Sequence, residues 1–199
     1  MDLIERIERL ELISKKIIIY NIMIELPFLQ LKNNEFEIAT FEILEMYNKD
    51  QTRNELYKLL SDDNNLKYIH ELKIDSSEEI EMYVTGFKKH IKDNVQYTYF
   101  IKRIKTNSII GEFILIPPKT VKDTYDIENV WFIQYILDSH YRDHGIMSQI
   151  LEMILYYLKG KIDKIGAICD ESNVASIKLL EKFDFKNIKI DWFDLEYYE

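Results

Sequence analysis

The chain has 199 residues, of which 47% are hydrophobic, and it carries a formal net charge of −9. This length and composition predict one domain with a sizeable core and room for an extension. The acidic balance excludes a general basic surface, so we expect no nucleic-acid partner, because neutralising phosphates requires clustered Lys and Arg.

The N-terminal 35 residues predict an extension outside the main pattern of motifs. Apolar residues recur at spacings of three and four through residues 2–15, which is typical of an amphipathic helix. The apolar run that follows, Ile17 to Ile24, is far shorter than the roughly 20 residues that a membrane span needs. No signal-peptide pattern is visible, so we expect a soluble, cytoplasmic protein without a membrane partner. We divide the chain into a helical extension, 1–35, and a domain, 36–199.

The first half of the domain predicts an alternation of strands and helices. Apolar alternation over Phe36 to Tyr47 predicts the first strand, and Asn48 to Asp50 is a turn and helix cap. The helix continues through Glu55 to Leu60, and Leu66 to Ile69 is predicted to be extended. Asp75 to Glu79 carries a helix-start signal, with acidic residues where the helix dipole favours them.

A β-hairpin is predicted next. Its strands are Gln96 to Ile104 and Ser108 to Ile116, joined by a turn at Lys105 to Asn107. Pro117 and Pro118 end the second strand. Residues 119–127 are polar and are predicted to form a loop.

The second half of the chain carries most of the chemical information. An alternating apolar strand, Glu128 to Asp138, ends at a polar loop in which Arg142 and Gly145 precede a long apolar-periodic helix. Free N–H groups at a helix N-terminus bind phosphate, and a glycine allows the backbone to approach an anion closely. A second strand, Ile162 to Cys169, is followed by another polar turn and a helix from Asn173 to Lys182.

These two segments resemble the signatures of the GCN5-related N-acetyltransferases (GNAT). Arg142 and Gly145 match the pyrophosphate-binding pattern Gln/Arg-x-x-Gly-x-Gly/Ala, while Met147 departs from its final small residue. Asn173 to Phe185 is similar to the pattern Asn-x-x-Ser/Ala…Leu-x-x-x-Gly-Phe, with Asp184 in place of the glycine. The resemblance covers roughly residues 36–191. The branch that it looks most like contains the ribosomal-protein N-terminal acetyltransferases.

The resemblance implies an α+β fold, an α/β/α sandwich whose mixed, mostly antiparallel sheet splays between its fourth and fifth strands and is flanked by helices. It implies acetyl-CoA as cosubstrate, lying in the gap with its pantetheine arm paired to the fourth strand. The backbone of Tyr135, Ile136 and Leu137 would face that arm. Asn173 would hydrogen-bond the arm or the backbone beside it, the alternative being an ordinary N-terminal helix residue. The N–H groups around the pyrophosphate would be those of Arg142, Asp143, His144, Gly145, Ile146 and Met147.

The implied reaction is transfer of an acetyl group to a primary amine by direct attack in a ternary complex. Holding the two reactants together supplies most of the rate, aided by an oxyanion-binding N–H, a base and an acid. Ser176 is the candidate acid, because Leu180 stands where many relatives carry Tyr; its other possible role is packing or capping. Phe132 stands where relatives often have Glu. The base therefore stays open among Tyr135, Glu128 and Glu112.

The acceptor is predicted to be either a protein N-terminus or a small amine such as a polyamine or an aminoglycoside. Two C-terminal strands, near 187–190 and 192–196, carry acidic residues that either face a cationic acceptor or lie on a solvated edge. No residue cluster has metal-ligand spacing, so we expect no metal. Cys169 is the only cysteine, which fits a reducing compartment. The protein is expected to be a monomer or a homodimer.

An alternative interpretation is a non-catalytic CoA-binding or partner-binding domain that keeps the GNAT fold. It is motivated by four departures from the pattern: Phe132, Met147, Leu180 and Asp184.

Overall fold

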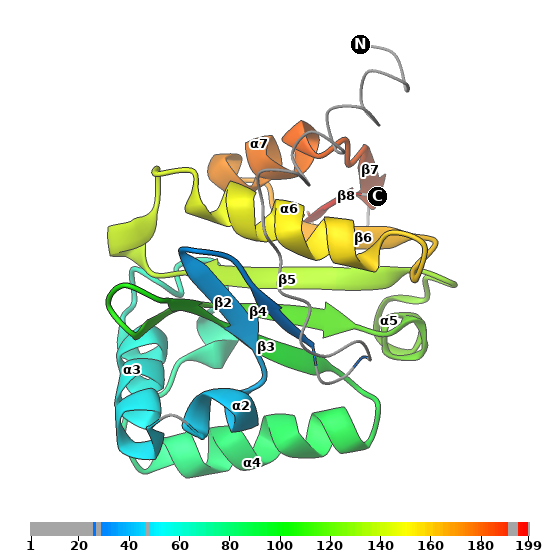
Figure 1. The fold of residues 1–199 in the computed structure, drawn as a ribbon. Coiled ribbons are helices and arrows are strands. Elements are labelled where there is room, and N and C mark those ends of the chain that lie inside the picture. Colours follow the sequence, from blue (N-terminus) through cyan, green and yellow to red (C-terminus); the bar gives the residue numbers. More distant parts are fainter. Residues whose placement is uncertain (1–25, 27–28, 47, 191–194, 199) are drawn as a thin grey trace.

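The computed structural model describes residues 26, 29–46, 48–190 and 195–198. The helix predicted over 2–15, and with it most of the proposed extension, lies outside these residues. The centre of the fold is an eight-stranded sheet in the order β1-β2-β3-β4-β5-β6-β8-β7, with helices on both faces (Figure 1). The α+β class and the mostly antiparallel sheet predicted from the sequence are confirmed.

The strands and helices alternate along the chain much as the sequence predicts. The strands are β1 (Gln30–Lys32), β2 (Phe36–Ala39), β3 (Tyr97–Arg103), β4 (Ser108–Ile116), β5 (Trp131–Leu137), β6 (Ile165–Asp170), β7 (Asn187–Ile190) and β8 (Leu195–Tyr198). The helices are α2 (Phe41–Glu45), α3 (Lys49–Ser61), α4 (Glu79–Lys92), α5 (Pro118–Tyr125), α6 (Ile146–Leu158) and α7 (Val174–Lys182). Short 3₁₀ turns cover His70–Leu72 and Ser139–Tyr141.

The sheet separates two apolar cores, because side chains alternate between the faces of each strand. On one face, residues such as Tyr99 and Ile101 pack with the apolar stripe of α6 and with Leu180 of α7. On the other face, Phe100 and Ile136 pack with α2, α3 and α4. Asn48 caps α3, accepting a hydrogen bond from the Gln51 N–H at 3.1 Å, as the sequence predicts.

Strands β5 and β6 are the only parallel neighbours in the described sheet, and they part along their length. Pairing joins Trp131 to Ile165, Phe132 to Gly166 and Ile133 to Ala167, and it stops there while β5 continues to Leu137. This is the predicted splay. Because β1 precedes the strand predicted to be the first, the splayed strands are the fifth and sixth in the chain rather than the fourth and fifth.

Gly166 shows why Phe132 fits at the closed end of the splay. A Cβ at Gly166 would lie 2.8 Å from Phe132 Cε1, so the ring packs directly against bare backbone. Val121 and Val130 complete the apolar cluster around the ring. An apolar side chain at this position is therefore part of the packing, where a carboxylate would be buried without hydration.

Three predictions of local structure are wrong. The predicted strand over 36–47 ends at Ala39, and α2 begins at Phe41, because Phe41 and Leu44 bury the same helix face three residues apart. The predicted loop over 119–127 is largely helix α5, which begins at Pro118 and buries Val121. Leu66 to Ile69 is a turn rather than an extended stretch, since the Ile69 N–H donates to the Leu66 carbonyl oxygen at 2.9 Å.

The last residues of the 1–35 segment join the sheet. Strand β1 pairs antiparallel with β2, and Leu29 and Leu31 are buried in the core on the α6 side.

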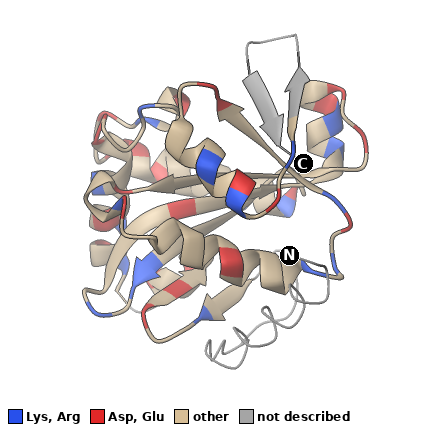
Figure 2. Cartoon of the chain, turned by 90° about the horizontal axis from the view of Figure 1, so that it is seen from above, with Lys and Arg blue, Asp and Glu red and all other residues tan. Residues whose placement is uncertain are grey.

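Acidic and basic residues are interspersed along the elements seen in Figure 2. Among the residues that the structure describes, no helix combines the length and apolar character needed to cross a bilayer.

Candidate active site

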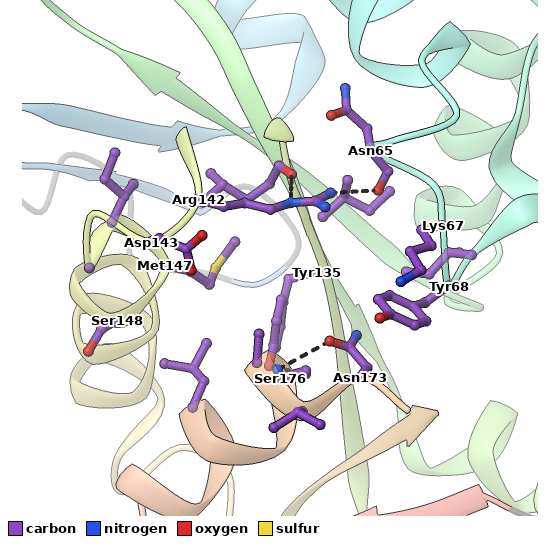
Figure 3. Close-up of a pocket in the computed structure, with 18 of the residues that line it drawn as sticks. Asn65, Lys67, Tyr68, Tyr135, Arg142, Asp143, Met147, Ser148, Asn173 and Ser176 are labelled. Carbon is purple, nitrogen blue, oxygen red and sulfur yellow. Dashed lines mark hydrogen bonds between the residues drawn. The ribbon is translucent and has the colours of Figure 1, made fainter. Parts of the chain in front are cut away.

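A cavity of about 500 Å³ opens where β5 and β6 part (Figure 3). Its walls come from the end of β5, the loop and first turn of α6, the turn after β6 with the first turn of α7, and the segment between α3 and α4. Three parts of the chain that are far apart in sequence, residues 65–69, 135–148 and 172–179, therefore meet at one opening.

Most of the residues predicted for the site lie around this cavity. Those that line it are Tyr135, Ile136, Leu137, Arg142, Asp143, Gly145, Ile146, Met147, Asn173 and Ser176. His144 is exposed and is absent from the lining, and its Nδ1 lies against the Arg142 carbonyl oxygen. Glu112 and Glu128 are also absent from the lining.

The loop before α6 presents its backbone to the cavity. Gly145 is the N-cap of α6 and has a left-handed φ of 71°, a conformation that favours glycine. The N–H groups of Ile146, Met147 and Ser148 have no acceptor within the helix, because the first helical bond runs from the Gln149 N–H to the Gly145 carbonyl. Three amide donors and the positive end of the helix dipole therefore lie beside the cavity.

Met147 departs from the small residue of the pattern for a reason visible in the core. Its side chain is 8% exposed and packs in the cluster that α6 forms with the sheet. Met147 also lines the cavity (Figure 3). The larger side chain is therefore accommodated by packing in this cluster.

Arg142 is held by carbonyl oxygens on two sides (Figure 3). Its Nε donates to the Leu137 carbonyl oxygen at 3.0 Å, and its Nη2 donates to the Asn65 carbonyl oxygen at 3.0 Å. The guanidinium thus joins the end of β5 to the segment between α3 and α4. Asn65 was not among the residues predicted for the site, because it ends a polar run that signals only the end of a helix.

Tyr135 and Ser176 meet inside the cavity, 2.7 Å apart between their hydroxyl oxygens. The Asn173 side-chain oxygen accepts from the Ser176 N–H at 3.2 Å, so Asn173 caps α7 while also lining the cavity. Burial raises the pKa of the Tyr135 hydroxyl, and the Ser176 hydrogen bond offsets this only in part. Tyr135 is therefore protonated at neutral pH and is suited to donate a proton rather than to accept one.

The two predicted carboxylate candidates lie elsewhere. Glu128 is 62% exposed and pairs with Lys122 on the surface; it sits in the turn before β5, because the strand begins only at Trp131. Glu112, on β4, is fully buried, and the Tyr83 hydroxyl lies 2.9 and 3.0 Å from its two oxygens. Burial raises the pKa of Glu112 to about 7, although the Tyr83 hydrogen bond acts in the opposite direction.

The wall opposite the α6 loop was not predicted. Lys67, Tyr68 and Ile69 line it, and the Tyr68 hydroxyl donates to the Ser172 carbonyl oxygen at 3.4 Å. The Lys67 ammonium lies 4.9 Å from the centre of the Tyr68 ring. The acidic residues predicted to form a wall at Asp191 and beyond lie among residues or side chains that the structure does not describe.

Comparisons with known proteins point to one family. A family model described as an acetyltransferase (GNAT) domain matches residues 43–186. A GNAT-family acetyltransferase from Bacillus anthracis is 19% identical with a TM-score of 0.61, covering 85% of this chain and 96% of that one. No match was found among curated proteins.

Two further solved structures have a similar fold. An acetyl transferase from Salmonella typhimurium, described as modifying the N-terminal serine of ribosomal protein L7/L12, is 19% identical with a TM-score of 0.53; the match covers 83% of this chain and 94% of that one. The microcin C7 self-immunity acetyltransferase MccE, solved with acetyl-CoA and AMP, is 15% identical with a TM-score of 0.62, covering 89% and 98%. At these identities the likeness shows the fold alone.

Proposed function

Because the chain belongs to the GNAT family and is an N-acetyltransferase, we propose that it transfers an acetyl group from acetyl-CoA to a primary amine by direct attack in a ternary complex. One observation supports this most strongly. A single cavity at the splay combines the amide-lined start of α6 with the paired hydroxyls of Tyr135 and Ser176. The first feature suits the donor's phosphates and the second suits its thioester.

The proposed donor site uses mostly backbone. The amides from Arg142 to Met147, together with that of Ser148, would hold the pyrophosphate at the helix N-terminus. The pantetheine arm would run along β5 from Tyr135 to Leu137, beyond the point where pairing with β6 stops. Asn173 and Ser176, in the first turn of α7, would contact the arm from the other side.

The proposed chemistry needs one proton donor at the sulfur. The neutral amine attacks the thioester carbonyl carbon, the tetrahedral intermediate collapses, and the C–S bond breaks to release the thiolate. Ser176 would donate its proton to that thiolate and be reprotonated by Tyr135, which its raised pKa keeps protonated. The proton of the attacking amine would pass to water and return through water to Tyr135, so that both hydroxyls end the reaction protonated. We propose neither Glu112 nor Glu128 as the base, since neither lines the cavity.

The acceptor is proposed to be a protein N-terminus in the first instance. The fold is shared with an acetyl transferase described as acting on the N-terminal serine of L7/L12, which supports a peptide acceptor. The acceptor would enter between the α3–α4 segment and the β6–α7 turn, past Lys67, Tyr68 and Ile69. A small amine is the second candidate.

Two measurements test the proposal. Calorimetry with acetyl-CoA should show binding, and its absence at high micromolar ligand would refute the donor site. Thiol release should then be followed with peptides carrying free N-termini, polyamines and aminoglycosides. Binding without turnover on any of these amines would contradict the proposed reaction and favour a domain that only binds CoA.

A further inference from the structure

Asn65 occupies an unusual position between the two sides of the cavity. It is 7% exposed, and each of its side-chain polar atoms has a partner. Its Nδ2 donates to the Leu59 carbonyl oxygen at 3.0 Å, and its Oδ1 accepts from the Ser139 N–H at 2.7 Å. A buried amide that is satisfied at both ends is fixed in one orientation, so Asn65 joins the end of α3 to the turn after β5.

The backbone of Asn65 makes the second connection. Its carbonyl oxygen accepts from Arg142 Nη2, while Arg142 Nε donates to the Leu137 carbonyl oxygen. Arg142 opens the loop that is proposed to hold the pyrophosphate, and Leu137 ends the strand that is proposed to pair with the pantetheine. One asparagine and one arginine therefore link both proposed donor contacts to the α3–α4 segment.

The segment that follows Asn65 forms the opposite wall of the cavity. We call residues 65–69 the acceptor wall, because Lys67, Tyr68 and Ile69 line the cavity facing the α6 loop and α7 (Figure 3). The wall is a turn between helices, closed by the Ile69 N–H to Leu66 carbonyl bond and by the Tyr68 contact with Ser172. Leu66 is buried, but Lys67 is exposed and Tyr68 and Ile69 are half-buried, so a neighbouring contact can change the order of this part of the wall.

We propose that Asn65 is a positioning residue that couples acetyl-CoA binding to the order of the acceptor wall, and this rests on the proposed donor site. Pyrophosphate at the α6 amides fixes the loop that begins at Arg142. The Asn65 side chain, bonded to Leu59 and Ser139, keeps its carbonyl oxygen within reach of the guanidinium, so fixing Arg142 also lowers the mobility of the wall from Asn65 to Ile69. Because coupling between two sites is reciprocal, an acceptor bound at the wall also tightens the hold on the donor.

Hydrogen–deuterium exchange of the full chain, with and without saturating CoA, tests the coupling without knowledge of the acceptor. In the wild type, CoA should slow exchange both in the loop 142–148 and in the acceptor wall. In Asn65→Ala, CoA should still slow exchange in the loop, while the protection of the wall is lost. Asn64→Ala is the matched control, because Asn64 is exposed and its side chain contacts Asp62; it should behave as the wild type.

A second variant keeps the test independent of the stability of Asn65→Ala. Arg142→Lys retains the positive charge but cannot reach two carbonyl oxygens with a planar fork, so it should also uncouple the wall while leaving Asn65 intact. Circular dichroism establishes that each variant is folded before exchange is measured.

The outcomes separate the two proposals. If CoA slows exchange in neither segment of the wild type, the proposed donor site is wrong. If CoA protects the loop but not the wall, the donor site stands and the coupling is refuted. If the wall stays protected in both Asn65→Ala and Arg142→Lys, CoA contacts the wall directly, and that also overturns the role of Asn65.

Discussion

Replacing Glu112 by glutamine should change how the stability of the protein depends on pH. Burial raises the pKa of Glu112 from 4.5 to about 7 in the folded state, so the folded state binds the proton more tightly than the unfolded chain does. Wild-type stability is therefore greatest below the unfolded pKa, falls as the pH rises to the folded pKa, and stays low above it. Between pH 5 and pH 8 the free energy of unfolding of the wild type should fall by about 2–3 kcal/mol through this titration.

Glu112→Gln removes this titration but keeps an oxygen that can accept from the Tyr83 hydroxyl. The added amide N–H carries a desolvation cost of about 1–3 kcal/mol, which is nearly independent of pH and cancels when two pH values are compared. Relative to the wild type, the variant should therefore be more stable at pH 8 than at pH 5. The expected difference is about 2–3 kcal/mol.

Urea denaturation followed by tryptophan fluorescence at pH 5, 6, 7 and 8 measures this difference directly. Glu128→Gln is the matched control: its carboxylate is largely exposed, and it should show a much smaller pH effect. The same relative stability of Glu112→Gln at all four pH values would refute the argument from burial. If Glu112→Gln transfers acetyl groups at close to the wild-type rate, Glu112 affects the stability of the protein and does not act as the base.

Three further substitutions test the site and its supporting sheet. Gly145→Glu brings a carboxylate to the proposed phosphate loop and should abolish acetyl-CoA binding in calorimetry. Gly145→Ala is the control: no atom lies within 4 Å of the added Cβ, so this variant should still bind acetyl-CoA, at a backbone cost to folding of about 1 kcal/mol. Normal binding by the glutamate variant would show that the loop is misassigned. Tyr135→Phe keeps the ring and removes the hydroxyl beside Ser176, so kcat in a thiol-release assay should fall about 100-fold with little change in KM for acetyl-CoA, and an unchanged kcat would remove Tyr135 from the chemistry. Gly111→Ala places a Cβ 2.5 Å from the Ile136 carbonyl oxygen and should destabilise by about 2 kcal/mol or more. Gly86→Ala, in open space within α4, should instead stabilise by up to about 1 kcal/mol, and equal melting temperatures for these two variants would contradict the contact.

The parts of the fold that sequence predicts well are those that local pattern determines. The hairpin of β3 and β4, the α6 stripe and the Asn48 cap all follow from residues that are close together in the chain. The loop at Gly145 is predictable because its left-handed φ requires a particular residue type. Asp184, which replaces the glycine of the pattern after α7, also has a positive φ of 66°, so its conformation is kept although its residue type is not.

The parts that sequence could not predict depend on contacts between distant segments. Tyr135 and Ser176 are 41 residues apart, and Asn65 and Ser139 are 74 apart, so no local period connects either pair. The burial that changes the pKa of Tyr135 and Glu112 likewise comes from packing. The strand predicted through Tyr47 was wrong for a related reason: the apolar run is short, and Phe41 and Leu44 lie on one face of a helix but on opposite faces of a strand, so their packing decides between the two.

The splay between β5 and β6 also creates a hazard for the free protein. Beyond Ile133, β5 loses its neighbour in β6, and a strand edge flanked by apolar residues can pair with an extended segment of another chain. Protein folds commonly block such edges with charge or proline, but an edge that accepts the proposed pantetheine arm cannot be blocked in that way. We therefore expect the unliganded protein to self-associate more readily than the CoA-bound form. Light scattering during storage, with and without CoA, would measure the difference.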